Sequence, residues 1–245
     1  MSVRELAEGR RWDTGITGEP VVAFSDLHMG DGSKADDFLE NESVFLQVLD
    51  WAKPFQKVYC GDVAELWQAK RKSIRAAHKN TLIRMRDDGG VYIFGNHDFS
   101  LSAWDGVFTY ERHIVGKTLF IHGYQPDRWN GKYRWAGRIA TWVGGMFERM
   151  GWQDIDESKR LSELCTPTQM SDTEFHKVED LYLDWAYEQA KEAGCTVVVF
   201  GHTHRPGMKV ADDVLVVNAG DWVSDEPTFV LVRRDCVELY KVAGG

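Results

Sequence analysis

Three short apolar segments, each followed at once by side chains that bind metals or move protons, constrain the fold of this chain most. The segments are Val21–Phe24, Lys57–Cys60 and Val91–Phe94. They are rich in β-branched or aromatic residues, which is typical of buried strands. Helical patterns over Asp36–Lys53 and Lys70–Asp88 separate them. This βαβαβ order predicts a parallel sheet whose three strand ends lie at one edge.

The second half of the chain adds further β structure. Its strand-like segments are His113–Val115, Thr118–Ile121, Thr196–Phe200, Val214–Asn218 and Thr228–Val242, the last interrupted by Arg234 and Asp235. Helical patterns dominate residues 124–194. We therefore predict an α/β sandwich of two sheets, forming a single domain over residues 1–245, with a helical cap insertion over residues 124–194.

Charge and composition exclude several classes of protein. The formal net charge of −9 over 245 residues disfavours a duplex-DNA binder, whose affinity comes mainly from neutralising phosphates. No apolar run approaches the ~20 residues that span a bilayer, and the charged first segment lacks the apolar core of a signal peptide. The four cysteines form no C-x-x-C pair, so we expect reduced thiols. These features favour a cytoplasmic protein.

Five polar motifs follow the predicted strands. They are Asp26-Leu27-His28, Gly61-Asp62, Gly95-Asn96-His97-Asp98, His122-Gly123 and Gly201-His202-Thr203-His204. Each motif alone is short enough to occur by chance in a chain of this composition. Chance does not explain why all five stand directly after an apolar β segment. Because ligands of open α/β sheets bind at the carboxyl ends of strands, the motifs predict one common site.

Together these motifs, from about residue 20 to 222, resemble the calcineurin-like metallophosphoesterase superfamily. The resemblance implies an αββα sandwich of two mixed β-sheets flanked by helices, with a dinuclear metal site at the strand ends. It implies that Asp62 bridges two metals, of which one is held by Asp26, His28 and His204 and the other by Asn96, His122 and His202. It also implies that His97 is the proton donor or phosphate contact and that Asp98 orients it.

The chemistry of these side chains agrees with the resemblance. Four imidazoles, two carboxylates and an amide oxygen suit two divalent ions of manganese, iron or zinc better than magnesium or calcium, and we expect manganese. Two such ions carry more positive charge than Asp26 and Asp62 offset, which leaves charge for a hydroxide and a phosphate oxygen. The expected activity is hydrolysis of a phosphoester or pyrophosphate bond by in-line attack of a metal-bridging hydroxide.

The segments 61–67 and 218–223, together with the helical insert, most resemble the UDP-diacylglucosamine pyrophosphate hydrolases of lipid A synthesis. Those hydrolases usually carry arginine where this chain has His97, and an acid where it has Tyr124. A related hydrolase that acts on another substrate is therefore an alternative. The residues after Asp62 also lack the arginine of the protein phosphatase signature G-D-x-x-D-R-G.

The insert combines tryptophans near helical spacing with a cluster of cations. Such an apolar stripe is usually core, but beside cations it could also bind an acyl chain joined to a phosphate. The insert is thus a candidate for peripheral membrane contact. The expected substrate is phosphorylated, either small or lipid-linked, and its expected contacts are Asn96, His97, Tyr124, Asp127, Arg128, Lys132 and Arg134.

Two alternatives use the same motifs. A phosphodiesterase or nuclease could act on nucleotides or single-stranded nucleic acid, because the chemistry does not depend on what flanks the phosphate. A scaffold built on a degraded phosphoesterase fold is the other alternative, and the intact set of seven ligands argues against it. The remaining histidines, His78, His113 and His176, are expected to be structural.

Overall fold

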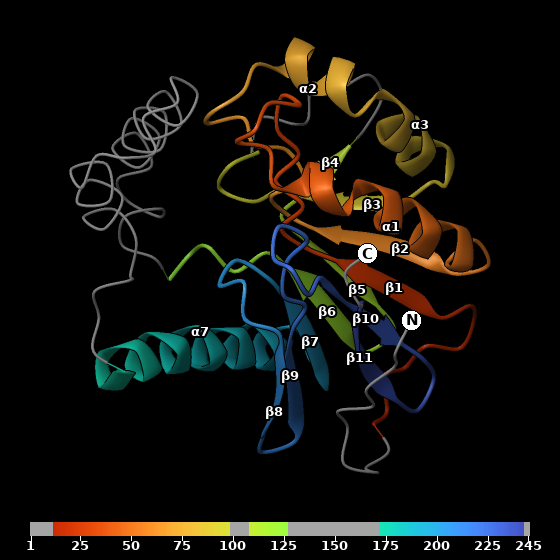
Figure 1. Ribbon diagram of the computed structural model, residues 1–245. Coiled ribbons are helices and arrows are strands. Elements are labelled where there is room, and N and C mark those ends of the chain that lie inside the picture. The colour runs from red at the N-terminus through yellow and green to blue at the C-terminus, as the bar shows by residue number, and fades with distance from the viewer. Residues whose placement is uncertain (1–11, 99–107, 127–171, 243–245) are drawn as a thin grey trace.

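The computed structural model describes residues 12–98, 108–126 and 172–242 (Figure 1), and describes the side chains of the last range from residue 180 onward. One sheet contains β1 (Val21–Phe24), β2 (Gln56–Cys60), β3 (Val91–Ile93), β4 (Thr109–Tyr110), β10 (Thr228–Val232) and β11 (Val237–Lys241). The other contains β5 (Arg112–Val115), β6 (Thr118–Ile121), β7 (Val197–Phe200), β8 (Gly207–Ala211) and β9 (Val214–Asn218). Their orders are β11-β10-β1-β2-β3-β4 and β5-β6-β7-β9-β8.

Both sheets are mixed, and their central strands are parallel. Strand β1 pairs in parallel with β2, and β2 with β3, as the βαβαβ pattern predicts. In the second sheet β6, β7 and β9 are parallel neighbours, while β5 and β8 pair antiparallel at its edges. The carboxyl ends of the parallel strands therefore deliver the loops that follow them to a common edge.

Helices cover the outer faces of the two sheets. Helices α1 (Phe38–Trp51), α2 (Arg71–Ala77) and α3 (Lys79–Asp87) lie over the first sheet, and α7 (Asp172–Glu192) lies along the second (Figure 1). Alternate residues of β1 pack into two different layers of the core, because successive side chains of a strand point to opposite faces of the sheet. Val22 and Phe24 join the core cluster under α1, whereas Val21 and Ala23 join the cluster between the sheets. The predicted αββα sandwich is confirmed.

One predicted helix is divided. The pattern over Lys70–Asp88 predicted a single helix, but α2 ends and α3 begins at His78, which has φ −106° and ψ 33°. The buried His78 ring lies between Asp36 Oδ2 at 2.7 Å and Glu42 Oε1 at 3.1 Å. The break in the helix lets the buried ring meet one buried and one partly buried carboxylate, and an unpaired polar ring inside the protein would be costly.

Other expectations fall partly outside the described residues. Helix α7 occupies the C-terminal part of the predicted insertion, whereas residues 127–171 lie outside the description. Cys60, Cys195 and Cys236 are free thiols, and Cys165 lies outside the described ranges. In the parts of the chain that the structure describes, no helix has the length and apolar character needed to cross a bilayer.

Candidate metal centre and active site

The candidate ligands stand where the parallel strands end, and there the backbone turns abruptly. Positive φ angles occur at five of them: Asp26 (53°), His28 (46°), Asp62 (50°), His202 (72°) and His204 (56°). This left-handed region costs a side-chain-bearing residue roughly 1–3 kcal/mol and is concentrated at functional sites. The strained backbone indicates that the surrounding structure holds these side chains in one common place.

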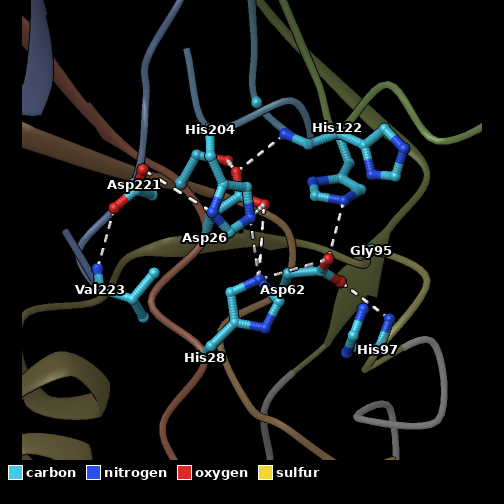
Figure 2. Close-up of polar contacts among 12 residues, drawn as sticks. Asp26, His28, Asp62, Gly95, His97, His122, His204, Asp221 and Val223 are labelled. Atoms are coloured by element: carbon cyan, nitrogen blue, oxygen red, sulfur yellow. Dashed lines mark hydrogen bonds and ion pairs between the residues drawn. The ribbon is translucent and has the colours of Figure 1, made fainter. Parts of the chain in front are cut away.

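A first group brings together Asp26, His28 and His204 (Figure 2). His204 Nε2 lies 3.3 Å from Asp26 Oδ1 and 3.3 Å from His28 Nε2. The two oxygens of Asp26 have different surroundings: Oδ2 accepts the His202 backbone N–H at 2.9 Å, whereas buried Oδ1 accepts no hydrogen bond. A buried carboxylate oxygen facing two imidazole nitrogens fits a metal ligand, because leaving it unpaired would be costly.

A second group brings together Asp62, His122 and His202. Asp62 Oδ2 lies 3.1 Å from His122 Nε2, and that nitrogen lies 3.2 Å from Asn96 Oδ1. Asn96 therefore joins this group, and nitrogen and oxygen donors converge as they would around one cation.

Asp62 lies between the two groups (Figure 2). Its Oδ2 is 3.1 Å from His122 Nε2 in the second group and 3.8 Å from His28 Nε2 in the first. Its other oxygen, Oδ1, accepts the backbone N–H of His97 at 2.8 Å, which fixes the carboxylate. One oxygen is thus oriented by the backbone while the other faces both groups, as a bridging ligand requires.

The charges of the buried groups favour bound cations. Burial tends to raise the pKa values of Asp26 and Asp62, but neighbouring histidines, His122 first, hold both well below their usual range. Burial tends to lower the pKa of His122, but Asp62 and Asp26 raise it to about 9. Burial and the charge of His122 lower the pKa of His202 to about 3. Two ionised carboxylates therefore attract positive charge into a buried site, which is what divalent ions would supply.

The far side of each imidazole meets a second polar group. His28 Nδ1 donates to Glu65 Oε2 at 2.9 Å, and His122 Nδ1 donates to the Cys60 carbonyl at 2.8 Å. His204 Nδ1 lies 3.7 Å from Asp221 Oδ2, and His202 Nε2 lies 3.4 Å from the Tyr182 hydroxyl. Such partners fix the tautomer and orientation of metal-binding histidines.

The partner of His97 differs from the expected one. Asp98 does not orient the ring, because its carboxylate accepts backbone N–H groups from Gly95 at 2.7 Å and Val63 at 2.6 Å. Instead, His97 Nδ1 forms an ion pair with Glu65 Oε2 at 2.7 Å. The Trp67 ring stacks on His97, with ring centroids 4.0 Å apart and planes 17° apart.

Glu65 is the site residue that the motifs missed. The same oxygen that pairs with His97 also accepts the N–H of His28, and His28, Glu65 and His97 form a third group that could hold a metal. The charges of His97 and His28 outweigh the effect of burial and lower the pKa of Glu65 to about 2. The sequence did place Glu65 and Trp67 three and five residues after Asp62, within the segment 61–67 that carries the resemblance, but without a stated role.

The expected substrate contacts are only partly described. Asn96 and His97 lie at the site as given above, and the Tyr124 ring is buried with its centroid 6.1 Å from that of His122. Asp127, Arg128, Lys132 and Arg134 lie outside the described residues. The structure therefore describes three of the seven predicted substrate contacts, and the three cationic ones are among the four that lie outside the described residues.

Residues 154–235, about a third of the chain, match the model of the Calcineurin-like phosphoesterase superfamily domain. This range includes His202, His204 and Asp221. A search of the curated proteins found no match.

Several solved structures are similar at low identity. A predicted phosphoesterase from Streptococcus pneumoniae is 15% identical, with a TM-score of 0.40 and coverage of 93% of this chain and 94% of that one. Vacuolar protein sorting 29 from Cryptosporidium parvum is 16% identical, with a TM-score of 0.46 and coverage of 92% and 98%. An archaeal phosphodiesterase is 14% identical, with a TM-score of 0.45 and coverage of 91% and 99%.

With TM-scores below 0.5, these likenesses add nothing to what the chain's own strands and side chains establish. The two mixed sheets and the clustered candidate ligands are observed directly. Residues 154–235 are similar to part of a calcineurin-like phosphoesterase domain, which agrees with a hydrolase acting on phosphoester bonds, and the site brings together side chains that could hold metal ions.

Proposed function

We propose that the chain is a metal-dependent phosphoesterase with a dinuclear site that hydrolyses a phosphoester or pyrophosphate bond. The observation that supports this most is the position of Asp62 Oδ2, within 3.1 Å of His122 Nε2 and 3.8 Å of His28 Nε2. In this proposal Asp26, His28 and His204 hold one ion, Asn96, His122 and His202 hold the other, and Asp62 holds both. When bound, the two ions, of which manganese fits the donors best, would activate water and polarise a phosphoryl oxygen.

His97 is proposed to give a proton to the leaving oxygen or to bind the phosphate. Its Nδ1 is engaged by Glu65, and its face is covered by Trp67, so Nε2 is the nitrogen that can meet a substrate. The His97 and His28 rings lie 4.7 Å apart, which keeps this nitrogen beside the first group. A general acid must be held within hydrogen-bond reach of the reacting group, and both contacts serve that purpose.

The substrate class is proposed to be an amphipathic pyrophosphate such as a UDP-diacylglucosamine. The support is that the sequence features shared with such hydrolases serve the site: Glu65 and Trp67 hold His97, and Asp221 stands behind His204. The helical insertion over residues 124–194 would bind the acyl part and could touch a membrane surface. Phosphodiesterase or nuclease activity is the alternative, because the same site would act on any accessible phosphoester.

A substrate panel tests both proposals. Metal-free protein would be loaded with two equivalents of Mn²⁺ and assayed with UDP-diacylglucosamine, bis(p-nitrophenyl) phosphate and single-stranded DNA, with metal content measured on the same sample. We expect manganese-dependent hydrolysis with the highest kcat/KM for the lipid-linked pyrophosphate. A preference for DNA would favour the alternative, and a doubly loaded protein inactive on all three would contradict the phosphoesterase proposal.

A further inference from the structure

The histidines of the two proposed metal positions contact groups of different charge on the side away from the metal. In the first, His28 donates to the Glu65 carboxylate at 2.9 Å, and His204 faces the Asp221 carboxylate at 3.7 Å. In the second, His122 donates to the Cys60 carbonyl at 2.8 Å, and His202 faces the Tyr182 hydroxyl at 3.4 Å. A carboxylate behind an imidazole makes it a stronger ligand than a neutral partner does.

The ligands themselves have the same asymmetry. If Asp62 is shared, the first position has a carboxylate of its own in Asp26, whereas the second has the neutral amide of Asn96. Affinity for a divalent cation rises with the number of charged ligands. The ligands and the groups behind them therefore both favour tighter metal binding at the first position.

Tyr182 connects the second position to helix α7. Tyr182 (7% exposed), Ala186 and Ala190 are buried at four-residue spacing, which places them on one helix face. That face packs in one cluster with Leu119 and Ile121 of β6. The Tyr182 ring centroid lies 5.3 Å from that of His202. The packing of the helix thus holds the phenol where it can fix the imidazole.

We propose that the two positions bind their ions with unequal affinity, the position of Asn96, His122 and His202 being the weaker, and that Tyr182 is its positioning residue. This inference rests on the proposed dinuclear site. If His202 holds the ion through Nδ1, its Nε2 carries the proton and can donate it to the Tyr182 hydroxyl, which lies 3.4 Å away. The backbone N–H of His202, which donates to Asp26 Oδ2 at 2.9 Å, fixes the residue from its other end.

Calorimetric titration of the metal-free protein with Mn²⁺ tests the inference. We expect two separate binding steps in the wild type. Tyr182→Phe keeps the packed ring but removes the hydroxyl, and should weaken the second step about tenfold while leaving the first unchanged. Tyr187→Phe is the matched control. Tyr187 stands on the same helix, but its hydroxyl makes an exposed hydrogen bond to Asp212 in the turn between β8 and β9, so both steps should persist.

Two further measurements separate positioning from general damage. In the wild type, the Mn–Mn coupling seen by electron paramagnetic resonance should appear only once more than one equivalent of Mn²⁺ has been added. In Tyr182→Phe it should require a higher Mn²⁺ concentration. Asn96→Asp, which adds a charged ligand to the second position, should tighten the second step. Equal affinities in the wild type, or an unchanged second step in Tyr182→Phe, would overturn the inference, whereas a wild type that binds fewer than two ions would overturn the dinuclear proposal itself.

Discussion

Glu65 Oε2 lies 2.7 Å from His97 Nδ1, so the proposed proton donor is held by Glu65 and not by Asp98, the acid that follows it in sequence. In Glu65→Gln the side chain keeps its size but loses the charge that pairs with the imidazole. At saturating Mn²⁺ we expect kcat to fall about a hundredfold, the size of a general acid–base contribution. The measurement is steady-state kinetics on Glu65→Gln, His97→Ala and the double variant.

The double variant decides how Glu65 acts. If it acts through His97, the double variant should be no slower than His97→Ala, because residues that work as a unit are not additive. Glu192→Gln, on the exposed surface of α7, is the control and should keep wild-type turnover. Fully additive losses would show that Glu65 and His97 work independently.

Asp62→Asn should remove the coupling between the two metal positions. The substitution keeps the shape but takes away the charge facing His28 Nε2 and His122 Nε2, at 3.8 and 3.1 Å. We expect fewer than two manganese ions per chain by elemental analysis, and turnover reduced at least about a hundredfold. Asp213→Asn, which alters an exposed acid 3.0 Å from Lys191, should bind and turn over as the wild type does. Full metal content with full turnover in Asp62→Asn would contradict the bridging role.

The central strands could be predicted from the sequence because they are buried on both faces. Val21–Phe24 and Val197–Phe200 lie at full burial along their length, which leaves the unbroken apolar runs seen in the sequence. Strand β8 (Gly207–Ala211) was missed because it is an edge strand with no buried residue, so no apolar pattern marks it. The sequence therefore predicts a strand where burial requires an unbroken run of apolar residues.

The missed contacts depend on residues that are distant in sequence. Nothing around His78 indicates that Asp36 and Glu42 will meet its ring, and nothing around His97 indicates that Glu65 replaces Asp98 as its partner. The ligands themselves stand directly after strands, where their position follows from the topology. Their partners stand in loops and helices, where only the folded structure selects the residue.

Gly201→Ala should disturb the first metal position, since a Cβ at Gly201 would collide with Ser25 Oγ and Asp26 Oδ2. Overpacking of this kind costs roughly 1–3 kcal/mol and here displaces a proposed ligand. We expect weaker manganese binding by calorimetry and a lower midpoint of urea unfolding. Gly207→Ala is the matched control, because a Cβ there meets no atom within 4 Å. Equal metal binding by the two variants would show that the close approach at Gly201 does not matter for the site.

The buried His78 should make stability depend on pH. Burial tends to lower its pKa, but Asp36 and Glu42 outweigh burial and hold the pKa above 6.5, while His78 outweighs burial at Asp36 and holds that pKa below 3.8. The raised pKa of His78 contributes stability that is complete below pH 6.5 and is lost as pH rises through that raised pKa. The lowered pKa of Asp36 contributes stability that is complete above pH 3.8 and is lost as pH falls through that lowered pKa.

His78→Gln should therefore lower the free energy of unfolding by on the order of 3 kcal/mol near pH 5, because it leaves the buried Asp36 carboxylate without its charged partner. The difference from wild type should shrink as pH rises through the raised pKa of His78, measured by urea unfolding from pH 5 upward. His113→Gln is a control of opposite sign, since burial alone lowers the pKa of His113, and its contribution to stability should grow with pH. A His78→Gln deficit that stays constant with pH would mean that the imidazole stabilises the fold as a neutral hydrogen-bonding group.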